Sequence, residues 1–389
     1  MLRHFLVIVM VLAGIAVLSH GAQAQKLLEN YIKPMPEIPL MPDAEFVKQS
    51  SLYSEVPFGD KALAFDIRVP NTWQKQRDVS LSNAALGSKL LGELMRFYGP
   101  AKLDNRSFIS MQAMQLDYKL TAEQWLLQYM LTNSYTVQGI KTYDLNRAEV
   151  LFIELDKDVT YIVRMAVQIN GKRVVMAKYY LPTQYWEDEK VIQAQVVGSF
   201  RILNPVVEFV ESMGKYQFLD VAEFLYPESW QLQTAPLRSI DRLETGLISV
   251  ASEEEVDKKK IKSLNGKMEI ELASVYVVND LDAEMRRARS ELEKTGLFIQ
   301  SLVEMHTDFN INPVFEAAPV EVYNLVDREN SMISYELWFA ILHTGDYYYM
   351  TYLVTPSRDQ DFFVWSRNTQ TFRVVMSTLA PQEGSLIED

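Results

Sequence analysis

The sequence predicts an α+β protein of two tandem α/β sandwich domains, each an antiparallel sheet flanked by helices. Repeated features predict this architecture. Residues 69–73 (VPNTW) recur as 226–230 (YPESW), and residues 199–202 (SFRI) recur as 371–374 (TFRV). Between them, the turn signals Asn170-Gly171 and Thr344-Gly345 each separate two apolar, β-rich runs. A repeated order of motifs is typical of a duplicated domain. We therefore expect two pairs of equivalent structural residues: Trp73 with Trp230, and Phe200 with Phe372.

Residues 1–24 have the features of a secretory signal peptide. A short start that contains Arg3 precedes an apolar run over residues 5–18, and the small-residue pattern Ala22-Gln23-Ala24 follows. The apolar run is short for a membrane span, which needs about 20 residues. We expect cleavage after Ala24 and no transmembrane segment in the mature protein; an uncleaved membrane anchor is the alternative.

The composition restricts the compartment and the partners. The chain has no cysteine and a formal net charge of −13. The lack of cysteine excludes disulfides, thiol catalysis, thiolate metal sites and the lipid anchor of a bacterial lipoprotein. Nucleic acids and anionic membrane surfaces attract clusters of Lys and Arg, so neither is an expected partner. These features favour a periplasmic protein that is not a lipoprotein.

A proline-rich leader is expected over residues 25–60. Four prolines lie close together: Pro34, Pro36, Pro39 and Pro42. Each proline fixes φ and removes a hydrogen-bond donor, so the segment should be extended. The simpler interpretation is a passive spacer, and the alternative is a docking ligand.

The first repeat is expected over residues 61–203. Alternation of apolar and polar residues, together with the Asn170-Gly171 turn signal, predicts strands at residues 64–69, 108–116, 148–155, 160–169 and 173–181. Capping residues and helical apolar spacing predict helices at residues 84–98, 121–131 and 187–197.

A linker over residues 204–214 leads to the second repeat, residues 215–376, which an acidic tail over residues 377–389 follows. The same order predicts strands at residues 222–226, 268–278, 320–326, 332–342 and 347–354, and helices at residues 281–294 and 361–371. The second repeat is longer, and its additional residues fall around 297–315. Insertions are best tolerated in surface loops, so we expect a loop there.

The expected helix over residues 84–98 is unusually apolar. Its apolar residues cover more than the single stripe that a surface helix needs. Such a helix is either buried between the repeats or exposed as a protein-binding face. The second interpretation makes five residues candidates for partner contact: Leu86, Leu90, Leu94, Phe97 and Tyr98.

Residues 65–73 (FDIRVPNTW) resemble the opening of the PsbP-like and DcrB-like domains. A strand, the Pro-x-x-Trp turn, a strand, a helix, three strands and a closing helix with a Phe-Arg ending follow in each repeat, so the resemblance spans most of the chain. It implies an antiparallel sheet sandwiched by helices. It also implies a non-enzymatic accessory or scaffold role in envelope or thylakoid-lumen complexes, with no catalytic or cofactor-binding residues to carry over.

Few residues offer chemistry. The expected mature chain has two histidines, His306 in the additional segment and His343 beside a turn, and neither has a counterpart in the first repeat. A metal site formed by this pair is a minor alternative. The acidic residues 187–189 should stabilise the start of a helix through its dipole, and a calcium site is the alternative. The charged run 253–262 suits a solvated helix or hairpin face, and partner docking is its alternative.

Trp73 and Trp230 should pack in the cores of the two repeats, and ligand stacking is the alternative. We therefore expect a non-catalytic, exported accessory or scaffold protein that acts through protein partners in the cell envelope and needs no cofactor. The alternative is a periplasmic protein that binds a small ligand or metal in the cleft between the repeats. A carboxylate- or tyrosine-based enzyme is the third hypothesis.

Overall fold

The computed structural model describes residues 32–76, 90–102, 105–237, 239–249, 265–278, 280–317, 319–328, 331 and 333–382. The chain divides into two compact units, Leu27–Val210 and Glu211–Asp389, hereafter unit 1 and unit 2. The expected signal peptide, Leu86, the charged run 253–262 and nearly all of the acidic tail lie outside the described residues.

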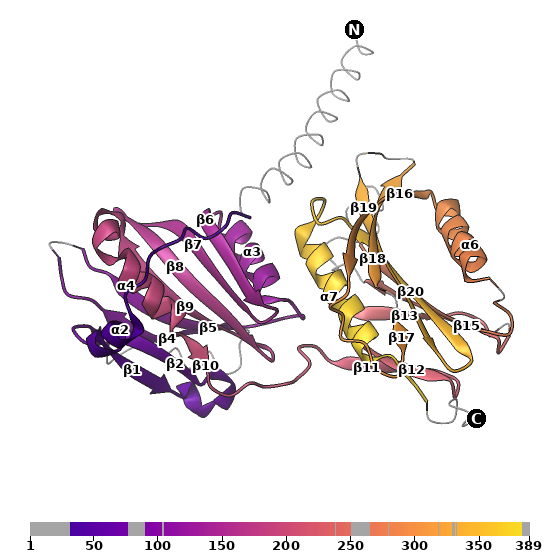
Figure 1. Ribbon diagram of the computed structural model, residues 1–389, viewed down its shortest axis with the longest axis horizontal. Coiled ribbons are helices and arrows are strands. Elements are labelled where there is room, and N and C mark those ends of the chain that lie inside the picture. The colour runs from indigo at the N-terminus through magenta and orange to yellow at the C-terminus, as the bar shows by residue number, and fades with distance from the viewer. Residues whose placement is uncertain are drawn as a thin grey trace, which may run out of the picture. The chain divides into compact units, whose positions relative to one another are not determined.

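Unit 1 contains a seven-stranded antiparallel sheet and a small three-stranded sheet (Figure 1). The order in the large sheet is β3 (Gln74–Lys75), β4 (Leu90–Tyr98), β5 (Phe108–Gln115), β9 (Arg173–Pro182), β8 (Val159–Asn170), β7 (Arg147–Asp156) and β6 (Thr136–Asp144). The small sheet joins β1 (Ser50–Glu55), β2 (Phe65–Pro70) and β10 (Arg201–Ile202). The helices are α2 (Asp43–Gln49), α3 (Ala122–Thr132) and α4 (Trp186–Gly198).

The core of unit 1 lies between the large sheet and a layer made of α4 and β2. Phe65, Ile67 and Val69 of β2 are buried there together with Val196 and Val197 of α4. Successive side chains of a strand point to opposite faces, so the other face of the large sheet needs its own cover. Helix α3 contacts that face over β6, β7 and β8. Its start is fixed by a capping box between Thr121 and Gln124.

Unit 2 contains an eight-stranded antiparallel sheet. Its main order is β13 (Trp230–Thr234), β14 (Arg242–Ser249), β15 (Lys267–Ser274), β20 (Tyr347–Pro356), β19 (Ser334–Thr344), β18 (Val320–Asp327) and β16 (Leu297–His306); β17 (Glu316–Ala317) also pairs with β19. A small sheet joins β11 (Met213–Phe218), β12 (Ala222–Pro227) and β21 (Ala380–Pro381). Helices α6 (Leu281–Lys294) and α7 (Phe362–Thr378) lie on opposite faces of the large sheet (Figure 1).

The two units have the same strand order in space relative to the order of the strands along the chain. The order β3-β4-β5-β9-β8-β7-β6 matches β13-β14-β15-β20-β19-β18-β16, and β1-β2-β10 matches β11-β12-β21. Each unit is an antiparallel sheet flanked by helices, so the predicted α+β sandwich class is confirmed.

The pairing of Phe200 with Phe372 is wrong. Phe200 follows α4 directly, whereas Phe372 lies within α7, which has 17 residues against 13 in α4. The backbone N–H of Arg68 donates to Ser199 Oγ (2.9 Å), and that of Leu225 donates to Thr378 Oγ1 (3.1 Å). These matching bonds make Leu379 the counterpart of Phe200. The longer α7 therefore shifts the Phe-Arg motif towards the start of the helix.

Two expected elements are also wrong. Residues 90–98 form strand β4 rather than the second half of a helix, and residues 84–89 lie outside the described residues. The register of β4 on β5 shifts at two places, and the neighbouring residues Leu94 and Met95 are both buried in the core. The strand therefore has more apolar residues than simple alternation requires. The expected loop at 297–315 begins with ten residues of strand β16, so the additional length follows His306 instead.

Candidate functional site

The outer edge of the unit 2 sheet is formed by β16, which pairs only with β18 among the described strands. Three large apolar side chains near its end are exposed: Leu302 (48%), Val303 (54%) and Met305 (52%). An edge strand presents unpaired backbone N–H and C=O groups, to which an extended segment of another chain can add. Sequence reasoning missed this site because it read residues 297–315 as inserted loop.

The corresponding edge of unit 1, strand β6, is covered by the proline-rich leader. The N–H of Ile140 donates to the carbonyl of Lys33 (2.7 Å), and Pro34 forms a parallel bridge with Ile140. A Cβ on Gly139 would lie 2.7 Å from Met35 Cα, so only glycine allows this close approach. The passive-spacer interpretation is therefore wrong for this part of the leader, which docks on its own chain.

The two edge strands have a matching register shift, but the residue that follows it differs. The register of β6 on β7 shifts between Val137 and Gly139, and that of β16 on β18 shifts between Leu302 and Glu304. Glu304 thus stands where Gly139 stands in unit 1. A segment added to β16 must pass farther from the strand at this point than the leader does. A charge and a bulge on an edge also oppose indiscriminate pairing.

The two candidate histidines lie on different strands, His306 on β16 and His343 on β19. His306 ends β16, and its ring stacks on Trp338 at 5.0 Å, with Glu304 at 3.5 Å and Asp308 at 3.8 Å. His343 lies 3.7 Å from Glu316. Among the described residues, no group of three or more His, Asp and Glu side chains is arranged to hold a metal.

The residues expected to contact a partner through a helix are placed differently. Leu94 and Phe97 are buried in the core of unit 1, so they are not available to a partner. Leu90 begins β4, and Tyr98 is half-buried at its end, 6.1 Å from the ring of Phe108. Trp73 and Trp230 are both buried in core clusters, each directly before or at the start of the first strand of its large sheet.

Acidic residues at the start of α4 serve the structure of unit 1. Glu187, Asp188 and Glu189 occupy the first turn, where carboxylates interact favourably with the helix dipole. Glu189 also accepts hydrogen bonds from Lys102 (2.6 Å) and Ser107 (2.6 Å). Glu187 pairs with Lys190, so two of these three carboxylates have partners within unit 1.

A buried lysine lies under α3 in unit 1. Lys178 of β9 is 2% exposed, and its Nζ donates to Tyr129 Oη of α3 at 2.7 Å. Burial lowers the pKa of Lys178 to about 8, since the charged form loses its hydration, although Glu154 opposes the shift. Burial also raises the pKa of Tyr129 and of Tyr180 well above 10.

We expect Lys178 to make unit 1 more stable as the pH rises from about 8 to about 10. In this window the folded protein has released the proton of Lys178 and the unfolded chain still holds it, so this one residue contributes about 2 kcal/mol. Burial raises the pKa of Tyr129 and Tyr180, so ionisation of tyrosines in the unfolded chain lowers stability as the pH approaches 10. The measurement is therefore the difference in the free energy of unfolding between the wild type and Lys178→Met, from urea unfolding at a series of pH values, and this difference should grow in favour of the wild type from pH 8 to pH 10. A difference that does not change with pH would contradict the assignment.

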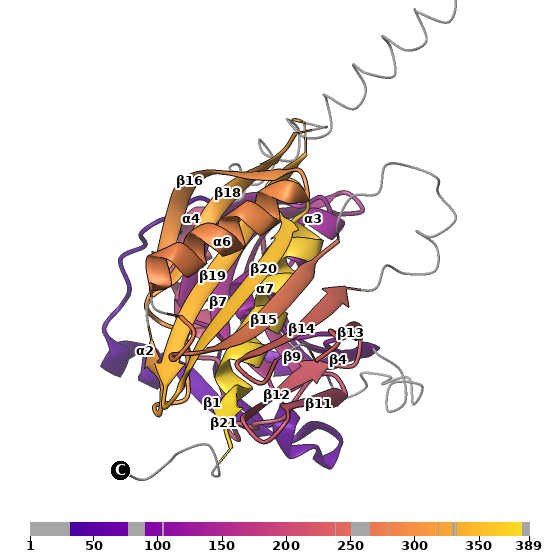
Figure 2. The ribbon, with the colours of Figure 1, turned by 90° about the vertical axis from the view of Figure 1, so that its right-hand side faces the viewer.

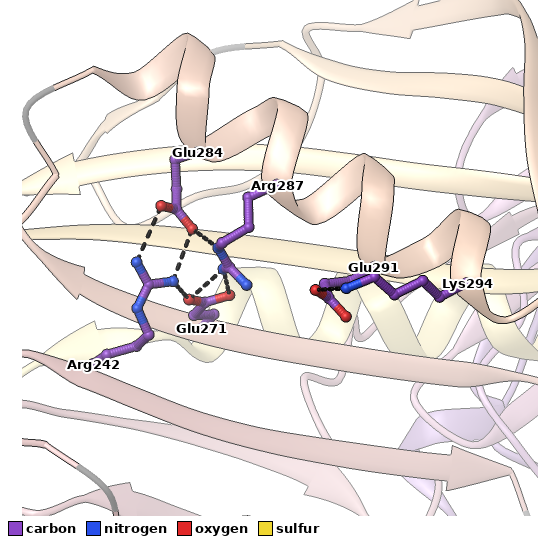
Figure 3. Close-up of polar contacts among 6 residues, drawn as sticks. All are labelled: Arg242, Glu271, Glu284, Arg287, Glu291 and Lys294. Atoms are coloured by element: carbon purple, nitrogen blue, oxygen red, sulfur yellow. Dashed lines mark hydrogen bonds and ion pairs between the residues drawn. The ribbon is translucent and has the colours of Figure 1, made fainter.

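Four charged residues fasten α6 to the sheet of unit 2 (Figure 3). Arg242 donates to both oxygens of Glu284 (2.7 and 3.0 Å), and Arg287 donates to both oxygens of Glu271 (2.7 and 2.6 Å). Arg242 also bonds Glu271, and Arg287 also bonds Glu284. The hydrogen bonds from Arg242 and Arg287 lower the pKa of Glu284. We call these four residues the α6 ion cluster.

Comparisons with known proteins show a remote likeness in fold. No family profile and no curated protein matches the chain. The chain is similar to the cyanobacterial PsbP protein CyanoP of Synechocystis sp. PCC 6803, with 14% identity over 43% of this chain and 99% of that one (TM-score 0.30). LpqN of Mycobacterium tuberculosis, described as involved in cell envelope biogenesis, has 11% identity over 43% of this chain and 100% of its own (TM-score 0.28).

A third similar structure is TplEi of Pseudomonas aeruginosa, an immunity protein of a type VI secretion system. It has 11% identity over 82% of this chain and 94% of its own, with a TM-score of 0.20. Likenesses this remote do not bear on function. Among the described residues, no helix is both long and apolar enough to cross a membrane.

Proposed function

We propose that this chain is an exported, non-catalytic accessory protein, built from two tandem PsbP-like or DcrB-like domains, that binds an extended segment of a protein partner along β16. The signal-peptide features of residues 1–24 support export. The matching strand order of the units supports duplication. The observation that carries the binding role is the exposed apolar edge of β16, at the position that the leader covers in unit 1.

The polar clusters support a structural rather than a catalytic role for both units. Lys178 is bonded to Tyr129 in unit 1, and the α6 ion cluster is paired internally in unit 2. Glu271 of β15 pairs with Met350 of β20, and Gln112 of β5 pairs with Met176 of β9, so Glu271 and Gln112 hold corresponding positions in the two sheets. The two units therefore do not share a polar constellation at this place.

Lysine at Val303 and Met305 should weaken partner binding about tenfold or more. Two charges would have to be desolvated where apolar side chains now meet the partner, and central apolar contacts typically dominate an interface. Both side chains are about half exposed, so the free energy of unfolding should change by no more than about 0.5 kcal/mol. The measurement is the yield of the co-purified partner from the native envelope, together with the urea unfolding curve of each variant.

Site-specific photo-crosslinking provides the control. A photoreactive residue at Val303 should give one crosslinked protein, whereas the same residue at Leu155, which is 69% exposed in unit 1, should not give it. The matched substitution Leu155→Lys should leave co-purification unchanged. The edge-binding role is wrong if a partner still co-purifies fully with the Val303→Lys/Met305→Lys variant, or if Leu155 gives the same crosslink.

A further inference from the structure

The sheet faces under α3 and α6 are covered to different extents. In α3, most side chains of one face are buried, among them Trp125, Leu126 and Met130. In α6, only Glu284 is buried. Helix α6 runs across the sheet near β16, its main strand contact (Figure 2). The apolar face of the unit 2 sheet is therefore incompletely filled by its own helix.

Helix positions counted from the N-caps explain the difference. Thr121 caps α3 and Asp280 caps α6. With these caps aligned, Glu284 stands at the position of Trp125, and Ala288 stands at the position of Tyr129. The rings of Trp125 and Tyr129 stack at 5.1 Å and occupy the space above the unit 1 sheet. A carboxylate and a methyl group cannot fill the same volume.

The unfilled volume is a cavity of about 280 Å³ between α6 and strands β16, β18, β19 and β20. Its apolar lining includes Ala288 and Leu292 from the helix and Ile299, Leu337 and Phe339 from the sheet. The volume is close to the lower limit of small-molecule pockets, roughly 300 Å³. It suits one narrow apolar group rather than two acyl chains or a peptide helix.

The tyrosine hydroxyls of the cavity are engaged by neighbouring carboxylates. Tyr323 Oη donates to Glu321, and Tyr352 is hydrogen-bonded to Glu269. These hydroxyls therefore do not require a polar ligand group in the interior. The α6 ion cluster fixes the N-terminal half of α6 to β14 and β15 (Figure 3). It therefore holds in place the helix that covers the cavity.

Two arginines line the helix side of the cavity. Arg286 and Arg289 are exposed lining residues, opposed there by Asp282. Arg286 has an exposed ion pair with Asp280 at 3.4 Å. Within the described part of the chain, Arg289 takes part in no hydrogen bond or ion pair, although it is near enough to Tyr323 to oppose the rise in that residue's pKa. A guanidinium without a partner matches a carboxylate in charge and geometry.

From these observations we propose that the cavity under α6 binds a medium-chain fatty acid anion, with the alkyl chain between α6 and the sheet and the carboxylate on Arg289 and Arg286. The apolar lining takes the chain, the cavity volume limits it to one, and the arginines select the anion. The cavity includes Ile299 of β16 but none of the exposed edge residues Leu302, Val303 and Met305, so ligand binding is tested without a protein partner.

Calorimetric titration of the full chain with three ten-carbon probes tests the proposal. Decanoate should bind with one site per chain, while decylamine, with the opposite charge, and decanol, with none, should bind at least about tenfold more weakly. Lauroyl lysophosphatidylglycerol distinguishes a free fatty acid from a lipid headgroup. Equal binding of decylamine, no saturable binding of decanoate, or tighter binding of the lysolipid would overturn the proposal.

Three variants locate the site. Ala288→Phe fills the cavity as Tyr129 does in unit 1, and it should reduce decanoate binding by about tenfold or more while the protein stays folded. Arg289→Gln should weaken decanoate about tenfold and leave decanol unchanged. Lys294→Gln, on the same helix but paired with Glu291, is the matched control and should bind normally. Wild-type decanoate affinity in both Ala288→Phe and Arg289→Gln would overturn the proposal.

Discussion

Replacing Trp230 with alanine should lower the free energy of unfolding of unit 2 by about 3–5 kcal/mol. The side chain is 2% exposed and belongs to the main core cluster of the unit, with Phe224, Met268 and Phe372. Its loss removes a large buried apolar surface and leaves a cavity that strands cannot close easily. The measurement is urea unfolding of the full chain, with hydrogen exchange to assign the loss to unit 2. Trp73→Ala should have a comparable effect in unit 1, where the indole lies 5.0 Å from Tyr179.

The matched control for Trp230→Ala is Leu237→Ala, since Leu237 is an exposed residue of the same unit. Its free energy of unfolding should change by no more than about 0.5 kcal/mol. Unchanged stability of Trp230→Ala together with a lost binding activity would show that the tryptophan contacts a ligand rather than the core.

Replacing Glu271 with alanine should lower the free energy of unfolding of unit 2 by about 2 kcal/mol, because Arg242 and Arg287 lose a shared buried carboxylate but stay partly exposed and keep Glu284 as a partner. Glu271 is 5% exposed, and Arg287 donates to both of its oxygens. Amide protection in α6 and β15 should fall with it, as the helix loses its attachment to the sheet. Hydrogen exchange measures this local loss directly.

Glu291→Ala is the control on the same helix. Glu291 pairs with Lys294 at 2.6 Å (Figure 3). Both side chains are largely exposed, and an exposed ion pair contributes little to stability. A double-mutant cycle of Glu271→Ala with Arg287→Ala isolates the coupling between the two residues. If Glu271→Ala lowered the free energy of unfolding no more than Glu291→Ala does, the α6 ion cluster would not fasten the helix to the sheet.

Much of the fold could be predicted because the strands and turns have strong local signals. The Asn170-Gly171 turn joins β8 to β9, and the Thr344-Gly345 turn joins β19 to β20, as expected from the sequence. Helices α3, α4 and α6 were also expected within a few residues, whereas α7 begins as expected but continues to Thr378, beyond the expected end at Thr371. In these segments the local preference and the tertiary packing agree.

The errors arose where tertiary contacts override local pattern. Residues 90–98 have the leucine-rich composition of a helix, but they form the strand between β3 and β5, in which register shifts accompany the burial of both Leu94 and Met95 in one core. The Phe-Arg motif is not equivalent in the two units, because a helix can lengthen by a turn and still deliver Ser199 or Thr378 to the same backbone N–H.

The candidate sites could not be predicted from local sequence. The β16 edge depends on which strand ends a sheet, and that order is set by pairings distant in sequence. The cavity under α6 depends on a comparison between Tyr129 and Ala288 that only aligned helix caps make visible. The ion cluster joins three separate elements, whose charges appear ordinary when read along the chain.

The contact between the leader and β6 has a consequence for the order of folding. Lys33 and Pro34 precede Ile140 by more than a hundred residues in the chain, so their contact closes a long loop. Closing such a distant contact requires β6 and β7 to pair first, since long-range contacts form late when loop entropy must be overcome. We therefore expect the leader to dock after β6 has paired with β7, and a chain truncated before β7 should leave the leader undocked.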